Sequence, residues 1–168
     1  MNIRRWIADP FVRGLTGLPL ALAAVPMAPA GRSAAAGRRQ LRVAARFPGP
    51  GAGPGAGSAV RDIGVGRVLG HSALMLVPAA LAFALAAMQL FLAWSGYLYP
   101  LRPDTIAALG HPFTPDRQVL PGAWGGPTLA GAWAVHAAVA LGSQAVCAVL
   151  LVGLCVVQNA GARWLAKP

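Results

Sequence analysis

The sequence contains very few acidic residues. Glutamate is absent, and the only acidic side chains are those of Asp9, Asp62, Asp104 and Asp116. Hydrolytic and transfer enzymes usually need an acid and a base held close together, and these aspartates are expected to lie on different sides of a membrane. The chain also lacks a phosphate-binding glycine loop, a zinc-ligand spacing and a nucleophile motif. We therefore expect no enzyme activity, no catalytic residues, no metal and no cofactor.

Histidine and cysteine are also scarce, with three and two residues. Cys147 and Cys155 are ~12 Å apart along a helix, which is too far for a disulfide. His71 and His136 are expected near opposite membrane faces, ~25–30 Å apart, so they cannot share a haem or a metal ion. Because His136, Ser143 and Cys147 fall on one helical stripe, a role for His136 in signal or ligand response, or in holding a metal, stays open beside structural packing.

Charged residues are missing from two long stretches. None lies between Arg67 and Arg102, and none lies between Arg117 and Arg163. Both gaps exceed the ~20 apolar residues that carry a helix across a ~30 Å hydrocarbon core. The sequence therefore predicts an all-α integral membrane protein, multi-pass in the plasma membrane. Its centre is an antiparallel two-helix transmembrane hairpin, preceded by a short N-terminal apolar and amphipathic helical region.

Basic residues, by contrast, are numerous and give the chain a net charge of +10. A basic surplus is typical of nucleic-acid binding or of contact with anionic lipid. Position favours lipid, because the basic residues flank the uncharged stretches, and we expect no nucleic-acid partner. The positive-inside bias then places both termini in the cytoplasm and the loop at 97–126 outside. The flanking basic residues are Arg32, Arg38, Arg39, Arg42, Arg46, Arg61 and Arg67 before the first stretch, and Arg163 and Lys167 after the second.

Residues 1–47 form the predicted N-terminal region. Its start resembles a signal peptide, although the arginines that follow oppose translocation. Prolines make residues 15–31 a poor spanning helix. Three alternatives stay open for this segment: it spans the membrane, it lies in the interface or it is cleaved. Residues 34–47 suit a short amphipathic helix on the inner leaflet. The Pro/Gly-rich residues 48–66 predict a flexible cytoplasmic linker.

Residues 67–168 form the predicted hairpin, with helices over about 68–96 and 128–157 and an external loop at 97–126. Small residues recur along both helices, which permits close helix approach, and aromatic residues gather at the expected membrane boundaries. The predicted packing residues are Ala82 and Ala86 on the first helix and Ala130, Ala134, Ala138 and Gly142 on the second. The predicted interface anchors are Trp94, Tyr97, Tyr99 and Trp164.

The histidine inside the second uncharged stretch needs a polar partner. Gln89 lies seven residues before Gly96, and His136 lies seven residues after Leu129. If these helix ends are level, both polar side chains sit ~10 Å below the outer membrane boundary. An interhelical hydrogen bond of this kind contributes ~0.6–2 kcal/mol. The sequence therefore predicts His136 and Gln89 as an interhelical polar pair.

The second predicted helix opens with the phrase WGGPTLAGAWAVHAAVALG, preceded by YLYPLRPDT. This region resembles the last membrane segments of the sensor domain that precedes many actinobacterial membrane histidine kinases. The similarity covers Val68–Ala162 and is weaker over residues 15–47. The matching signature positions are Trp124, Gly125, Gly126, Pro127, Gly131, Trp133 and His136.

The resemblance implies four helices in two pairs and sensing of an extracytoplasmic or membrane signal. This chain departs from the family pattern, because its first helix pair is reduced to one poor segment and the sequence contains no phosphoacceptor helix and no ATP-binding domain. One hypothesis is a sensor-like or regulatory module without its own kinase, which acts on a partner through helix contacts. The alternative is a non-sensing structural accessory subunit of a transporter or other membrane complex. Expected partners are the lipid bilayer and a second copy or another membrane protein, such as a histidine kinase.

Overall fold

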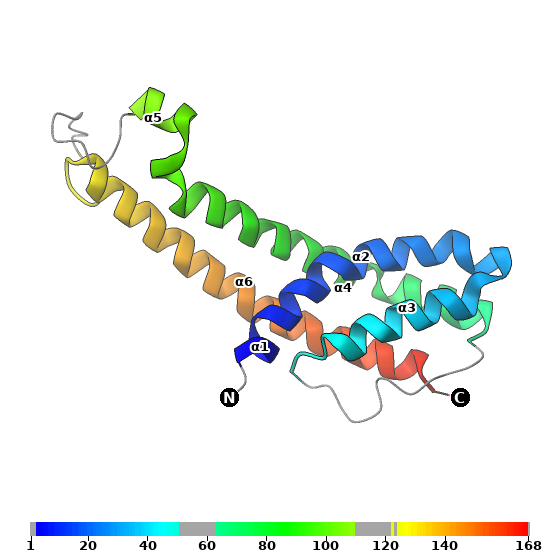
Figure 1. Ribbon diagram of the computed structural model, residues 1–168. Coiled ribbons are helices and arrows are strands. Elements are labelled where there is room, and N and C mark those ends of the chain that lie inside the picture. Colours follow the sequence, from blue (N-terminus) through cyan, green and yellow to red (C-terminus); the bar gives the residue numbers. More distant parts are fainter. Residues whose placement is uncertain (1–2, 51–62, 110–121, 123, 168) are drawn as a thin grey trace. The chain divides into compact units, whose positions relative to one another are not determined.

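Helices make up the regular structure of this chain wherever it is described. The computed structural model describes residues 3–50, 63–109, 122 and 124–167 (Figure 1). Within these ranges it contains α-helices, two π-helical turns and one 3-10 turn, and no strand. The all-α prediction is confirmed for this part of the chain.

Three helical segments are long and apolar enough to cross a membrane. They are Ile3–Arg46, Val65–Tyr97 and Leu129–Leu165. The last two correspond to the two predicted hairpin helices, and the first is the N-terminal region. The chain therefore fits a membrane protein, but a two-helix hairpin is not confirmed as its complete membrane architecture.

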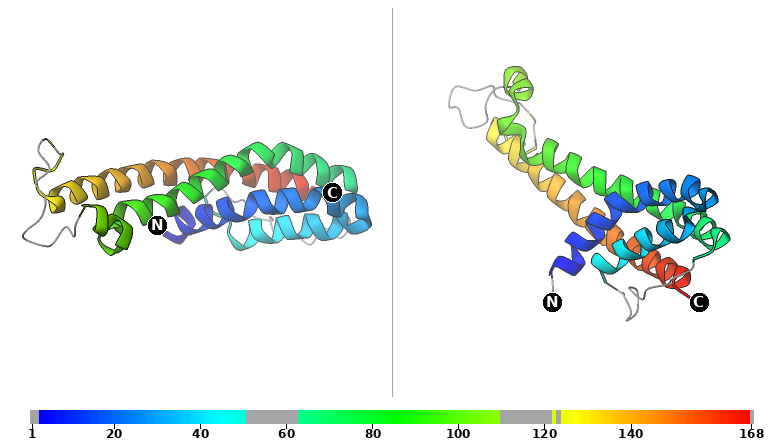
Figure 2. Two further views of the ribbon diagram at one scale, coloured as in Figure 1. Left: turned by 90° about the horizontal axis from the view of Figure 1, so that it is seen from above. Right: turned by 45° about the vertical axis from the view of Figure 1, so that its right-hand side comes forward.

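The N-terminal segment folds back on itself. It consists of α1 (Ile3–Trp6), α2 (Ala8–Met27), the π-helical turn η1 (Ala28–Arg32) and α3 (Ser33–Arg46). Inside η1 the backbone leaves helical geometry, and Gly31 takes a φ of +74°, a conformation that glycine adopts without steric cost. As a result α2 and α3 lie side by side as an antiparallel helical hairpin (Figure 2).

Two prolines inside α2 do not end the helix. Pro19 and Pro26 lie within its 20 residues, which corresponds to ~30 Å, enough to match a hydrocarbon core. Each proline removes one backbone hydrogen bond, a loss that helix packing can offset in a membrane protein. Helix α2 is therefore longer and more continuous than the prolines led us to expect.

Helix α3 is amphipathic, as predicted for residues 34–47. Its buried face carries only small and apolar residues, and Gly37 lies so close to Ile63 that a Cβ there would be 2.6 Å from Ile63 Cδ1. Its opposite face is exposed and basic. The buried residues are Ala36, Gly37, Leu41 and Ala44, and the exposed arginines are Arg38, Arg39, Arg42 and Arg46.

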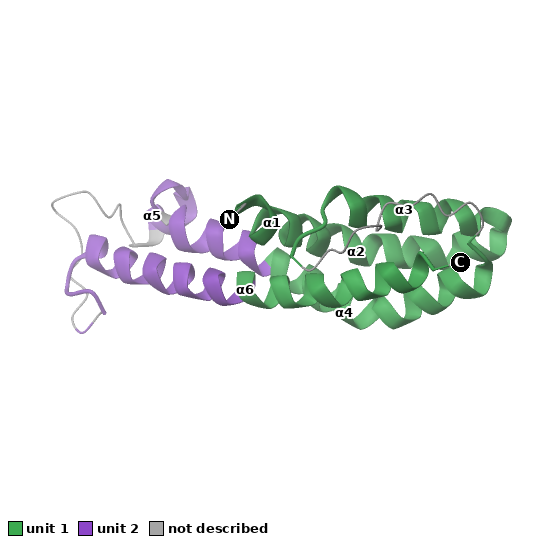
Figure 3. Ribbon diagram, turned by 90° about the horizontal axis from the view of Figure 1, so that it is seen from below, with its two compact units in different colours: residues 1–87, 148–168 green, residues 88–147 purple. Residues whose placement is uncertain are grey.

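The described chain divides into two compact units (Figure 3). Unit 1, residues 1–87 and 148–168, contains the N-terminal hairpin together with most of α4 (Val65–Leu92) and the C-terminal part of α6 (Leu129–Leu165). Two clusters of buried apolar side chains hold it together. The larger includes Ala24, Ala28, Leu41, Ile63, Val68, Ala162 and Leu165, and the smaller is formed by Ala82, Ala86 and Leu151.

Helix α2 approaches α4 most closely at Gly14. A Cβ at this position would lie 2.8 Å from the backbone oxygen of Ala82 and 3.1 Å from Ala86 Cβ. Ala82 and Ala86, which the sequence marked for helix packing, are both buried here. Their small side chains and the bare backbone of Gly14 bring two helices together, as small residues commonly do in membrane bundles.

The C-terminal helix continues past its predicted end at residue 157. Gln158 and Asn159 both lie inside α6, which runs to Leu165. Both side chains are buried, and Asn159 accepts and donates hydrogen bonds within unit 1. These polar residues therefore face the interior of the bundle and do not mark a helix end.

Unit 2, residues 88–147, contains the end of α4, the turns η2 (Ala93–Tyr97) and η3 (Tyr99–Leu101), helix α5 (Pro103–Leu109) and the first part of α6. Gly96 lies against α6 at Ala140, and a Cβ on Gly96 would collide with the Cβ of Ala140. The predicted linker residues 51–62 and the loop residues 110–121 and 123 are outside the described residues.

The start of α6 explains two of the signature residues, Gly125 and Gly131. Thr128 caps the helix, because its Oγ1 accepts a hydrogen bond from the Gly131 backbone N–H at 3.1 Å. Gly125 takes a φ of +94°, and its backbone packs directly on that of Gly131, so that a Cβ on either glycine would collide with the carbonyl of the other. Pro127 precedes this cap and does not start the helix.

This contact predicts that Gly131→Ala destabilises the start of α6. The added methyl meets backbone that cannot move aside cheaply, and overpacking of this kind costs ~1–3 kcal/mol. Gly142→Ala on the same helix is the matched control, because nothing lies within 4 Å of its added Cβ. Thermal unfolding in detergent should show a lower melting temperature for Gly131→Ala only, and equal losses for the two variants would contradict the packing.

Candidate functional site

A cavity with four polar residues in its otherwise apolar lining lies within unit 1. Its volume is about 50 Å³, and α2, α3, α4 and α6 each contribute part of its wall. Apolar side chains such as Leu20, Leu41 and Met75 form most of the lining. The polar lining residues are Arg13, Gln40, His71 and Gln158.

Three of these four polar side chains are more than nine-tenths buried. Arg13 is 5% exposed, Gln158 7% and His71 8%. Three polar atoms at the cavity have no hydrogen-bond partner within the described chain: Gln40 Oε1, His71 Nδ1 and Gln158 Nε2. Buried polar atoms are nearly always paired in folded proteins, so these unpaired atoms indicate a site that takes a polar guest.

The remaining polar groups at the cavity tie its walls together. Gln40 Nε2 donates to Ser72 Oγ at 3.1 Å, which links α3 to α4. The Arg13 guanidinium donates to Asn159 Oδ1 and, at 3.8 Å, to Cys155 Sγ, which links α2 to α6. The cavity is therefore bordered by polar links between different helices.

Asn159 also holds the chain segment that follows α3. Its amide nitrogen donates to the carbonyl oxygens of Pro48, at 2.8 Å, and Pro50, at 3.1 Å. A single side chain thus accepts from a buried cation and donates to two backbone carbonyls. The start of the region that the sequence predicted as a flexible linker is packed onto α6.

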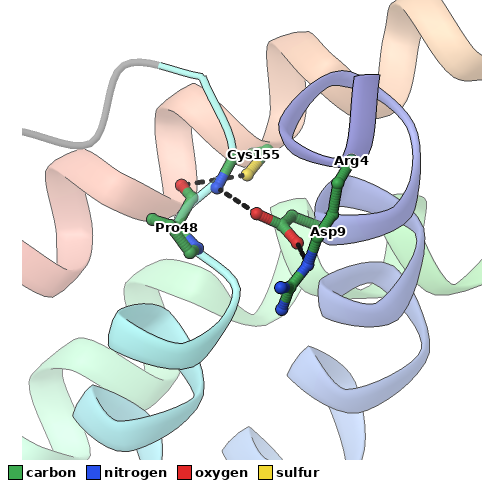
Figure 4. Close-up of polar contacts among 5 residues, drawn as sticks. Arg4, Asp9, Pro48 and Cys155 are labelled. Carbon is green, nitrogen blue, oxygen red and sulfur yellow. Dashed lines mark hydrogen bonds and ion pairs between the residues drawn. The ribbon is translucent and has the colours of Figure 1, made fainter. Parts of the chain in front are cut away.

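Asp9 forms a second polar cluster beside Pro48 (Figure 4). Its Oδ1 lies 3.4 Å from Arg4 Nε, and its Oδ2 accepts the backbone N–H of Gly49 at 3.3 Å. Cys155 Sγ lies 3.9 Å from the Pro48 carbonyl oxygen. The Asp9 carboxylate, 2% exposed, is thus held by Arg4 and a backbone amide.

The predicted pair of His136 and Gln89 is not formed. His136 is exposed, and the Gln89 carbonyl oxygen accepts a hydrogen bond from Gln144 Nε2 at 3.0 Å. The Tyr97 hydroxyl donates to Gln144 Oε1 at 2.8 Å. The prediction assumed level helix ends, but Gly96 faces Ala140, eleven residues into α6, so the two helices are offset by about three turns.

The offset also changes the packing face of α6. Ala134, Ala138 and Gly142 are exposed and Ala130 is half-buried, whereas Ala140 is buried against Gly96. Because residues 140 and 142 point in nearly opposite directions on a helix, the predicted small-residue face is turned away from α4. Within unit 2, Ala134, Ala138 and Gly142 therefore do not form the contact between α6 and α4.

The predicted interface anchors fall into two groups. Trp94 and Trp164 are exposed, in keeping with aromatic side chains at a membrane boundary. Tyr97 instead bonds Gln144 between the two helices. The side chain of Tyr99 lies outside the described residues.

Of the other signature residues, Trp124 and Gly126 are exposed, and Trp133 is half-buried.

Outside the long apolar helices, Arg102 and Asp104 form an ion pair at 2.6 Å at the start of α5. Their hydrogen bond lowers the pKa of Asp104 and raises that of Arg102. Any stability from Asp104 is therefore present above its unfolded pKa and lost as the pH falls through the lowered value. Asp104 is exposed and Arg102 only half-buried, so the pair contributes little to stability.

Comparisons with family models, with curated proteins and with solved structures give no match to this chain. The geometry of its own residues therefore carries the functional argument. Within the described ranges no group of three or more His, Cys, Asp or Glu residues is placed to hold a metal ion. The cavity lined by Arg13, Gln40, His71 and Gln158 is the candidate site.

Sequence reasoning missed this cavity. Arg13 and His71 lie within apolar helices, and an ionisable residue at such a position is a recognised signal of a functional site. The sequence alone does not connect these two residues, because they come from different helices and Gln40 and Gln158 complete the site from two more. A polar residue on each of four helices becomes informative only when the bundle brings them together.

Proposed function

We propose that this chain is an integral membrane sensor-like or regulatory module with no enzymatic reaction of its own. It passes an extracytoplasmic or membrane signal to a partner through helix contacts. One observation carries the proposal: a charged and incompletely paired cavity lies inside an apolar helical bundle. Ionisable residues are costly in such surroundings, and a well-packed apolar core is often at least as stable as a buried charged one, so stability alone does not account for Arg13.

The links around the cavity supply a means of transmission. Arg13, Gln40 and Asn159 connect the N-terminal hairpin and residues 48–50 to α4 and α6. A guest that changes these links changes how α2 and α3 pack on the long helices. A ligand shifts such a packing equilibrium by its difference in affinity for the two arrangements.

The exposed arginines of α3 are the surface that this movement would displace. The positive-inside bias favours a cytoplasmic position for α3 and for both termini, and an external position for the loop at 97–126, in the plasma membrane. The resemblance to the sensor domain of membrane histidine kinases supports the same direction of signalling. The partner is accordingly a membrane histidine kinase that reads the position of α3.

Site-specific photo-crosslinking in native membranes tests this function. A photoreactive amino acid replaces Arg42, on the exposed face of α3, and the control position is Leu74, an exposed apolar residue of α4. We expect a crosslink to a histidine kinase from position 42 and none from position 74. Recovery of transporter subunits alone from both positions would reject the sensor role and support the accessory subunit.

A further inference from the structure

The cavity in unit 1 is lined by a buried positive charge that forms no direct ion pair with a carboxylate in the described chain. Arg13 is 5% exposed, and a guanidinium remains protonated in proteins. Within the described chain it forms no ion pair, and it donates instead to Asn159 Oδ1 and Cys155 Sγ. Asp9, one turn earlier on α2, attracts Arg13 only at longer range than an ion pair, and its carboxylate is held by Arg4 and by the Gly49 backbone N–H.

A buried charge of this kind calls for a counter-charge. Removing an ion from water without a partner costs several kcal/mol. Neutral acceptors such as the Asn159 amide and the Cys155 thiol compensate only part of this cost. The polar lining residues Arg13, Gln40, His71 and Gln158 include no carboxylate. The lining of the cavity therefore does not neutralise the positive charge of Arg13.

Two further groups at the cavity are suited to donate to an anion. Gln158 Nε2 and His71 Nδ1 are buried and have no hydrogen-bond partner in the described chain. Together with the Arg13 guanidinium they supply donors from α2, α4 and α6. The remaining unpaired atom, Gln40 Oε1 on α3, is an acceptor and can receive a hydrogen bond from water or from a hydroxyl group on the guest.

The size of the cavity limits the guest. A buried water molecule needs ~10–15 Å³ of cavity volume. A cavity of about 50 Å³ therefore holds one small anion with one or two waters. We infer that the cavity binds a single small monovalent inorganic anion, with Arg13 as its counter-ion. The inference deepens the proposed sensor function by naming the chemical class of its ligand.

Thermal unfolding of the purified full-length chain in detergent tests the anion site. Chloride or bicarbonate is titrated at constant ionic strength against gluconate, which is too large for the cavity. We expect the melting temperature to rise by about 3–5 °C for each tenfold increase above the dissociation constant. Identical melting in chloride, bicarbonate and gluconate would overturn the inference.

Two variants separate binding in the cavity from general salt effects. Gln158→Glu places a carboxylate in the cavity wall, so it should stabilise the protein in gluconate and abolish its response to chloride and bicarbonate. Arg42→Gln removes an exposed arginine of α3 and should keep the full response. An unchanged response in Gln158→Glu, or a lost response in Arg42→Gln, would reject the site.

A third variant identifies the anion. Gln40→Leu removes the acceptor at the cavity and should weaken the response to bicarbonate, whose hydroxyl can donate to Gln40, while the response to chloride stays. The melting and crosslinking experiments are independent. Anion binding with no kinase crosslink would retain the site and reject the signalling role, whereas a kinase crosslink without anion binding would reject only the site.

Discussion

Replacement of Asn159 by Leu should lower the free energy of unfolding by ~3–5 kcal/mol, because each buried polar group left without its hydrogen bond costs ~1–3 kcal/mol and a charged one costs more. Asn159 accepts from the Arg13 guanidinium and donates to the carbonyl oxygens of Pro48 and Pro50. Leucine has a similar volume but no polar atoms. The buried cation and two carbonyls would therefore lose partners at once.

Thermal unfolding in detergent measures this loss, and Asn159→Asp is the matched variant. Aspartate keeps an acceptor for Arg13 and adds a negative charge beside it, but it cannot donate to the prolyl carbonyls. We expect Asn159→Asp to melt well above Asn159→Leu and to become more sensitive to protease near residues 48–50. If the two variants melt alike, the link between Arg13 and Asn159 contributes nothing to stability.

Gly14→Ala is expected to separate α2 from α4 and to reduce stability by ~1–3 kcal/mol, as overpacking usually does. The added Cβ would lie 2.8 Å from the backbone oxygen of Ala82, which cannot rotate away as a side chain can. The same substitution at Gly17, one turn along α2, meets neighbours only at 3.6 Å and beyond. Gly17→Ala should therefore be tolerated.

The comparison of these two alanine variants isolates the contact from helix propensity. Alanine is ~1 kcal/mol better than glycine in a helix interior, so both variants gain the same intrinsic preference. Thermal unfolding in detergent should show a lower melting temperature for Gly14→Ala and an equal or higher one for Gly17→Ala. A stabilised Gly14→Ala variant would show that α2 does not pack against α4 at this position.

The helices of this chain could largely be predicted from sequence, because their signals are local. The uncharged stretches after Arg67 and Arg117 match α4 and α6, and the spacing of arginines after residue 33 matches α3. A stretch of apolar residues, or an alternation of apolar and basic ones, has the same meaning wherever the helix finally packs. The sequence did not clearly predict the N-terminal candidate span, because Pro19 and Pro26 locally disfavour a helix.

The contacts between helices could not be predicted in the same way. The pairing of Gln89 with His136 required the helix ends to be level, whereas Gly96 lies opposite Ala140. Register depends on how loops and close contacts position whole helices, which a pattern within one helix does not contain. The cavity depends on four helices and was missed for the same reason.

Cysteine accessibility in whole cells tests most directly the claim that the apolar helices lie in lipid with the basic face of α3 in the cytoplasm. In a background of Cys147→Ala and Cys155→Ser, single cysteines replace Trp124, Arg42 and Val149, all exposed in the structure. A membrane-impermeant maleimide should label Trp124→Cys in intact cells and Arg42→Cys only after permeabilisation. Val149→Cys, surrounded by lipid, should stay unlabelled throughout. Labelling of Val149→Cys from water, or of Arg42→Cys in intact cells, would contradict the account.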